Sequence, residues 1–178
     1  MIPETLRTDR LILRPLADGD AKAMAEALSD WDVVKWLAVV PWPYSLADAR
    51  AFIAAAAPDG ELGRAGERTW ALALEAEPDR LVGVVGLGAE LGYWLDRAAW
   101  GRGLMTEAAR AILASRFEDD PATPVLSGYF DGNEPSARVL AKLGFVGEGV
   151  APRSCIARGE DVPSHRMRLT PEAFAAGA

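Results

Sequence analysis

The segment from Glu90 to Phe117 constrains the fold more than any other part of the sequence, because it joins a strand to a helix through two closely spaced glycines. "ELGYWLD" is typical of a strand, and apolar residues recur at helical spacing from Met105 to Phe117. Gly101 and Gly103 have no side chains, so the backbone between the two elements can bend sharply and approach a ligand closely. The N–H groups that open the following helix are free, and the helix dipole is positive there. The junction therefore predicts a binding site for an anion such as a pyrophosphate.

Two other phosphate-binding loops fit this segment less well. The sequence has no G-x-x-x-x-G-K-[ST] motif, which excludes a kinase-type P-loop. Thr106 stands where the third glycine of a G-x-G-x-x-G dinucleotide fingerprint belongs. A G-x-G pair by itself is weak, and a tight turn with two incidental glycines is the alternative interpretation.

Hydrophobic periodicity and turn residues predict the other elements. Strands are expected at 10–16, 68–76, 80–87, 124–130, 145–150 and 164–169, with a Pro78–Asp79 turn that makes the second and third strands a hairpin. Helices are expected from Asp18 or Asp20 to Leu28, over 46–57 after Ser45, and from Asn133 to Gly144. The order β-α-α-β-β-β-α-β-α-β-β indicates a mixed α/β sheet, in a single domain over residues 1–178.

Composition and charge argue against several classes of function. The net charge of -7 and the pI near 4.8 disfavour nucleic acid and anionic membrane surfaces as partners, because both attract basic proteins. One cysteine, Cys155, and one histidine, His165, allow neither an intramolecular disulfide nor a Cys/His metal cluster. The N-terminus lacks a basic segment followed by an apolar one, and no apolar run reaches the length of a membrane span. We therefore expect a cytoplasmic protein without a metal.

Three segments in order resemble the GNAT superfamily of N-acetyltransferases, and within it the branch of the ribosomal-protein (Rim-type) N-acetyltransferases. "TDRLILRPLADGDA" is similar to the opening strand and helix of that branch. "ELGYWLDRAAWGRGLMTEA" is similar to its fourth strand and acyl-CoA pyrophosphate loop, and "NEPSARVLAKLGF" to the next cofactor-binding helix. The resemblance covers nearly the whole chain. It implies a central, mostly antiparallel and splayed seven-stranded sheet flanked by helices, and an enzyme that uses acetyl-CoA (coenzyme A).

The resemblance also implies which positions bind the cofactor. Backbone N–H groups from Gly101 to Thr106 would hold the pyrophosphate, and the exposed backbone of Trp94 and Leu95 would pair with the pantetheine arm as an added strand. Asn133 and Ser136 would face the arm and the sulfur. The full set of expected cofactor-binding positions is Trp94, Leu95, Trp100, Gly101, Arg102, Gly103, Leu104, Met105, Thr106, Asn133, Ser136, Arg138 and Lys142.

Two positions depart from the usual pattern of this family. Trp100 replaces the leading Gln or Arg of the loop, and Met105 stands where the loop usually ends in glycine or alanine. The Met105 side chain would either crowd the phosphates or point into the core. The cations that can neutralise the phosphates are Arg97, Arg102, Arg138 and Lys142.

The expected reaction is direct attack of an amine on the thioester while both substrates are bound, which needs no covalent enzyme intermediate. Glu90 starts the strand beside the expected thioester position and is the hypothesised general base, acting through water. Its alternative role is a solvated strand end. Ser136 is the hypothesised proton donor to the leaving thiolate, and a bond to local helix backbone is its alternative role. Tyr129 is a substitute donor or else a packing residue.

The acceptor is constrained less than the donor. A lysine amine has a pKa of about 10.4 and an α-amine about 8, so deprotonating lysine at neutral pH costs roughly 3 kcal/mol more. A protein N-terminal α-amine is therefore favoured, a small-molecule amine is the alternative, and a non-catalytic acyl-CoA-binding module stays open. Four aromatic residues can line the acceptor entrance or, as is more common, form core: Trp31, Trp36, Trp42 and Tyr44. Exposed sheet edges make a homodimer one possibility.

Overall fold

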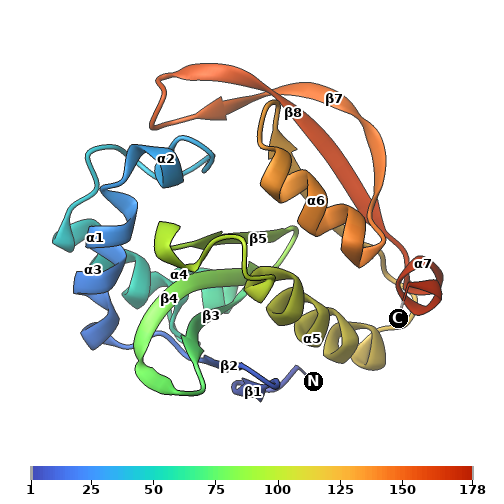
Figure 1. The fold of residues 1–178 in the computed structure, drawn as a ribbon, viewed down its shortest axis with the longest axis horizontal. Helices are drawn as coiled ribbons and strands as arrows, with labels where there is room; N and C mark the ends of the chain where they lie inside the picture. Colours follow the sequence, from blue (N-terminus) through green and yellow to red (C-terminus); the bar gives the residue numbers. More distant parts are fainter. Residues whose placement is uncertain (1, 178) are drawn as a thin grey trace.

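The computed structural model describes residues 2–177, and its strands form two sheets that splay apart (Figure 1). The larger sheet is antiparallel and runs in chain order through β1 (Leu6–Arg7), β2 (Leu11–Arg14), β3 (Arg68–Leu74), β4 (Glu77–Leu87) and β5 (Leu91–Leu95). The smaller sheet has the order β6 (Val125–Phe130), β8 (Glu160–Leu169), β7 (Val146–Cys155) and is also antiparallel. The predicted mixed, mostly antiparallel, splayed architecture is confirmed, with five and three strands in place of seven.

Helices cover both faces of the larger sheet (Figure 1). On one face lie α1 (Ala21–Leu28) and α3 (Leu46–Ala56), with the short α2 (Trp31–Val34) and α4 (Glu61–Arg64) next to them. On the other face lies α5 (Leu104–Asp119), which packs against α6 (Glu134–Leu143). The remaining helical segments are η1 (Asp18–Asp20), η2 (Arg97–Ala99) and α7 (Pro171–Ala176).

Strand alternation gives each face of the larger sheet its own core. Trp70 and Leu72 point toward α5 and belong to the larger buried cluster, together with Ile112 of that helix. Ala71 and Val84 point the opposite way and pack with α1 and α3 in a smaller cluster. Within a strand of this sheet, residues an even number of positions from Trp70 or Ala71 therefore share the face of that residue.

The predicted caps Ser45 and Asn133 are confirmed, whereas Asp20 precedes α1 without a side-chain capping hydrogen bond. Ser45 accepts the N–H of Asp48 and Asp48 accepts that of Ser45, a reciprocal capping box at the start of α3. Asn133 caps α6, and Gly144 ends that helix at a φ of 92°, a left-handed conformation that suits glycine. These local signals fix where the two helices begin and end.

The predicted strand limits were wrong at two hairpins, β3–β4 and β7–β8. Pro78 and Asp79 belong to β4, and the chain reverses instead at Glu75 and Ala76, with Leu74 paired to Glu77. A register irregularity after Leu72 takes up the extra residues in the longer strand. β7 and β8 extend well beyond the predicted 145–150 and 164–169 and form one long hairpin. Pro152 in β7 and Pro163 in β8 interrupt the alternating pattern, so the sequence did not predict the full length of these strands.

No helix among the described residues is long and apolar enough to cross a membrane. Across residues 2–177, no group of three or more His, Cys, Asp or Glu side chains is placed to hold a metal ion.

Candidate active site

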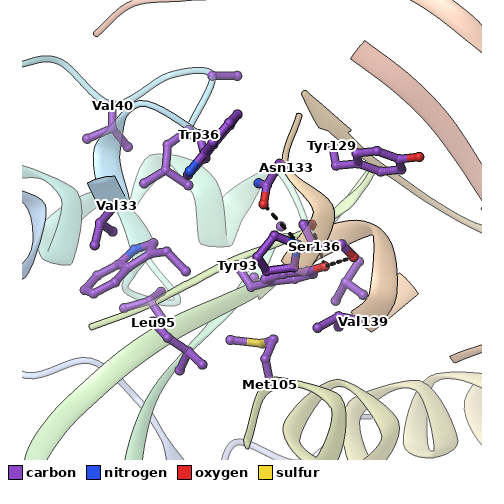
Figure 2. Close-up of a pocket in the computed structure, with 18 of the residues that line it drawn as sticks. Val33, Trp36, Val40, Tyr93, Leu95, Met105, Tyr129, Asn133, Ser136 and Val139 are labelled. Carbon is purple, nitrogen blue, oxygen red and sulfur yellow. Dashed lines mark hydrogen bonds between the residues drawn. The ribbon is translucent and has the colours of Figure 1, made fainter. Parts of the chain in front are cut away.

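A cavity of about 770 Å³ lies where β5 and β6 diverge (Figure 2). Its walls come from both sheets, from the loop before α5, from α6 and from the segment between Val33 and Tyr44. Twelve of the thirteen predicted cofactor positions line it, and Arg102 is the exception. Glu90 and Tyr129 line it as well. The fold thus brings together residues that are separated by more than forty positions in the sequence, although their roles stay predictions.

The predicted pyrophosphate loop has the conformation that its glycines allow. Gly101 has a φ of 73° and Gly103 a φ of 75°, both left-handed, and Gly103 is the residue that caps α5. The first helical N–H groups of α5 follow at once, at the wall of the cavity. A helix start with free N–H groups can bind an anion, so pyrophosphate binding by this loop stays a prediction.

Arg10 holds this loop in place, a role that the sequence did not reveal. Its guanidinium donates to the carbonyl of Arg102 at 2.9 Å and, through Nε, to Glu107 Oε2 at 2.7 Å. Burial opposes ionisation of Glu107, but hydrogen bonds from Thr8 and Arg10 outweigh it and lower the pKa of that carboxyl. Glu107 therefore stays charged and is tied to Thr8 and Arg10, in the segment that leads into β2.

The Met105 side chain points into the core. It is 3% exposed and packs within the larger hydrophobic cluster beside Leu104, while also touching the inner wall of the cavity (Figure 2). Of the two alternatives raised by the sequence, the structure therefore supports core packing, and the loop keeps its N–H groups uncovered by this side chain.

The pairing of β5 with β4 determines which peptide groups of β5 point outward from the sheet. Asp96 donates its N–H to Val82 of β4 at 2.9 Å. Hydrogen-bonded and non-hydrogen-bonded pairs alternate along antiparallel strands, so Trp94 also turns its N–H and C=O toward β4. Tyr93 and Leu95 turn theirs toward the gap. The open-edge backbone is thus that of Tyr93 and Leu95, which corrects the predicted pair Trp94 and Leu95.

Side chains close this open edge at both ends. The indole Nε1 of Trp100 donates to the carbonyl of Leu95 at 2.9 Å, and Ser127 Oγ donates to the carbonyl of Leu91 at 2.8 Å. Between the carbonyls of Leu91 and Leu95, the N–H and C=O of Tyr93 point outward, and no strand within residues 2–177 pairs with them. Trp100, a departure from the family pattern, therefore borders the slot in which an extended arm can pair.

Ser136 sits at the start of α6, held by two neighbours (Figure 2). Its N–H donates to Asn133 Oδ1 at 3.3 Å, and its Oγ lies 2.9 Å from the phenolic oxygen of Tyr93. Burial raises the pKa of Tyr93 to about 12, although the hydrogen bond with Ser136 acts in the opposite direction. The phenol therefore stays protonated at physiological pH and can donate to Ser136. Sequence reasoning missed Tyr93, whose only signal was its place in "ELGYWLD".

The other two predicted catalytic residues are engaged elsewhere. Glu90 Oε2 accepts from Arg153 of β7 at 2.8 Å, an ion pair that spans the two sheets at the cavity wall. Tyr129 stacks on His165 with ring centroids 4.6 Å apart, and Asp131 Oδ1 lies 2.9 Å from His165 Nε2. Neither Glu90 nor Tyr129 bonds to Ser136.

Two of the four aromatic residues expected at the acceptor entrance line the cavity, namely Trp36 and Tyr44. Trp31 and Trp42 do not line it and instead pack edge to face with centroids 5.0 Å apart, at 40% and 49% exposure. The prediction was therefore wrong for this pair. They are therefore neither cavity wall nor core, the two roles that the sequence had suggested.

The hairpin of β7 and β8 closes the cavity over Trp36. Arg158 places its guanidinium 4.9 Å from the Trp36 ring and donates to the carbonyl of Lys35 at 2.8 Å. Ile156 donates its N–H to Ala38 at 3.0 Å. In Figure 1 the hairpin arches over the molecule to reach the segment that follows α2. Contacts between distant parts of the chain thus build this wall.

Three of the four predicted cations remain available near the loop. Arg138 and Lys142 line the cavity on α6, and no ion pair within the described residues engages their side chains or that of Arg102. Arg97 bonds instead to Asp32 at 2.8 Å and lies outside the cavity lining. The structure therefore gives no support to Arg97 as a phosphate ligand.

The chain matches one family of known proteins, the GNAT acetyltransferases. Residues 10–146 match the model described as the acetyltransferase (GNAT) domain. The chain is 27% identical over 180 residues to an uncharacterized N-acetyltransferase, p20, of Bacillus licheniformis, covering 97% of this chain and 99% of that protein.

Two solved structures share the fold. Microcin C7 self immunity acetyltransferase MccE, in complex with acetyl-CoA and AMP, has a TM-score of 0.79 at 18% identity, covering 94% of this chain and 97% of that one. Mycobacterium smegmatis RimJ, in complex with CoA-disulfide, has a TM-score of 0.73 at 19% identity, covering 93% and 88%.

Proposed function

The chain belongs to the GNAT acetyltransferase family, and we propose that it transfers the acetyl group of acetyl-CoA to a protein N-terminal α-amine by direct attack. The observation that carries the reaction is the open edge of β5 beside the glycine loop. An extended amide-containing arm can pair with Tyr93 there, while its diphosphate reaches the start of α5. The two sets of groups face one cavity.

The residues present fit acetyl-CoA. The cavity joins a run of free backbone groups, a helix start and the cations Arg138 and Lys142, which suit an amide arm that ends in phosphates. Acetyl-CoA supplies an activated acyl group as its thioester. The protein contributes position and hydrogen bonds, and neither Cys155 nor His165 lines the cavity.

Ser136 and Tyr93 manage the leaving sulfur in this proposal. When the amine nitrogen bonds to the thioester carbon, the carbon–sulfur bond breaks and its electron pair moves to the sulfur. The Ser136 hydroxyl donates toward that sulfur, while the phenol of Tyr93 donates to Ser136 Oγ and directs the serine hydrogen into the cavity. The proton lost by the attacking amine passes through a water molecule to Glu90, the proposed general base, which lines the same cavity.

An α-amine is easier to deprotonate than a lysine amine, which favours a protein N-terminus. A specific observation favours a second candidate, a small apolar amine, because the acceptor half of the cavity is walled by Trp36, Val40, Tyr44 and Phe52. We propose that either acceptor is acetylated in the cytoplasm, by a protein that can form a homodimer through its exposed sheet edges.

Calorimetry with acetyl-CoA, followed by free-thiol release with a panel of amines and peptides, tests the function. We expect acetyl-CoA to bind and thiol to be released when peptides with a free N-terminus are added. Release with small amines but not with peptides would contradict the N-terminal assignment. Binding without release for any acceptor would favour a non-catalytic acyl-CoA-binding module.

A further inference from the structure

We propose that Glu67, rather than Glu90, binds the ammonium group of the acceptor, an inference that rests on the acetyltransferase function proposed above. An amine acceptor with a pKa near 8 to 10 arrives mostly protonated at neutral pH. A cation that enters an apolar cavity needs an anionic partner, because desolvation is otherwise costly. Among the described residues that line the cavity, Glu67 and Glu90 are the two that carry carboxylates.

The two carboxylates differ in what they already contact. Glu90 is neutralised by its 2.8 Å ion pair with Arg153, and moving it to an ammonium would leave that guanidinium without its partner. Glu67 lines the same cavity, and its carboxylate makes no ion pair or hydrogen bond within the described residues. Glu67 is therefore the anion that is free to take a new cation.

The strand register aims Glu67 across the sheet toward Glu90. Arg68 pairs with Leu87, so Glu67 comes opposite Gly88, and the N–H of Gly88 donates in turn to Glu90. Directly opposed residues of antiparallel strands share a face, so both carboxylates lie on the same face. A Cβ on Gly88 would lie 2.3 Å from Glu67 Cγ, so the Glu67 side chain occupies the space that this glycine leaves.

The next row of the sheet forms a floor without large side chains. Thr69 pairs with Gly86, and Gly86 pairs with Gly92, and all three line the cavity. A Cβ on Gly92 would have no neighbour within 4 Å, so this position faces open space. Glu67 stands at one end of this floor, and Trp94 occupies the same face at the other end. The ligand class is thus a primary ammonium with an apolar group beside it.

Such an ammonium can come from a small amine or from a peptide N-terminus, and the two sources are separated by experiment. The probes are phenethylamine and a short peptide with a free N-terminal leucine, each titrated calorimetrically into the protein saturated with coenzyme A. Thiol release from acetyl-CoA is then measured with the same two probes. The stronger binder of the two identifies the source.

The decisive variant is Glu67→Gln, compared with Glu90→Gln and with Glu77→Gln as a matched surface control on the same hairpin. We expect Glu67→Gln to weaken binding of the better probe by about ten- to a hundredfold, the usual cost of losing a charged hydrogen-bond partner. Affinity for acetyl-CoA should stay within about twofold, and Glu77→Gln should match the wild type. Gly88→Ala, which displaces the Glu67 side chain and keeps its charge, should weaken probe binding in the same direction.

Three results would settle the matter. Probe affinity in Glu67→Gln within twofold of the wild type, together with a large loss in Glu90→Gln, would overturn the inference while leaving the proposed function intact. Probe binding that depends on Glu67 without any thiol release would support the inference and count against the proposed function. A drop in melting temperature for Glu67→Gln would move the test to Gly88→Ala, where unchanged probe affinity again overturns the inference.

Discussion

Replacing Tyr93 by phenylalanine tests whether the hydrogen bond to Ser136 acts in the reaction. The substitution keeps the ring in the larger core and removes only the phenolic oxygen, which lies 2.9 Å from Ser136 Oγ. A neutral hydrogen bond contributes about 0.5–1.5 kcal/mol net, and each 1.36 kcal/mol is tenfold in rate. If the bond acts fully in the transition state, kcat should fall by about two- to twelvefold, with the KM for acetyl-CoA nearly unchanged.

The assay is initial-rate thiol release at saturating acetyl-CoA for four proteins: the wild type, Tyr93→Phe, Ser136→Ala and the double variant. Loss of a general acid typically costs about a hundredfold or more, so Ser136→Ala should be the slower single variant. Because the phenol acts only through the serine, the second substitution should change the rate of Ser136→Ala by less than about twofold.

Additive effects would refute this reasoning. If Tyr93→Phe slows the Ser136→Ala enzyme by the same factor as it slows the wild type, then the phenol acts independently of the serine. A rise in the dissociation constant for acetyl-CoA that accounts for the whole effect would also refute it, because the hydroxyl would then serve binding alone.

Three further predictions follow from the structure. Gly92→Ala adds a methyl group to the cavity floor without contacting the protein, so the KM for the acceptor should rise about tenfold while the melting temperature stays within about 1 °C, as enzyme kinetics and a thermal melt will show. Asp20→Ala breaks a bidentate pair with Arg14 in which Asp20 is 3% exposed, so chemical denaturation should give a loss of about 3 kcal/mol or more, and an unchanged midpoint would contradict this. Burial raises the pKa values of Tyr44 and Tyr93 to about 12, above the ordinary value near 10 that the unfolded chain keeps. The folded state therefore holds protons that the unfolded state releases, so urea midpoints should fall as the pH rises from 10 to 12, and less steeply in Tyr93→Phe.

Local signals in the sequence were sufficient to predict the ends of α3 and α6 and the glycine turn before α5. Ser45, Asn133 and Gly144 mark helix ends through hydrogen bonds within a few residues, so they act in the same way in any tertiary context. Gly101 and Gly103 likewise predict a sharp turn before a helix, and both adopt left-handed φ angles there. These features depend on neighbours in the chain, which is why a pattern alone predicts them.

Three features of the candidate site could not be predicted from the sequence, because they depend on contacts between distant strands. Which peptide groups of β5 face the gap depends on its register with β4, and this exchanges Trp94 for Tyr93. The pairing of Glu90 with Arg153 depends on a hairpin whose length the prolines concealed. Glu67 belongs to no sequence motif, so nothing in the sequence indicated that its carboxylate lines the cavity.

The sequence by itself determined the family, the mixed α/β fold and the glycine turn before α5, because short-range spacing encodes each of them. Only the tertiary structure decided which carboxylate is free, which hydroxyl supports Ser136 and which aromatic residues face the cavity. The physical reason is that charge pairing and strand register are set by contacts between residues far apart in the chain, and those distances exist only after folding.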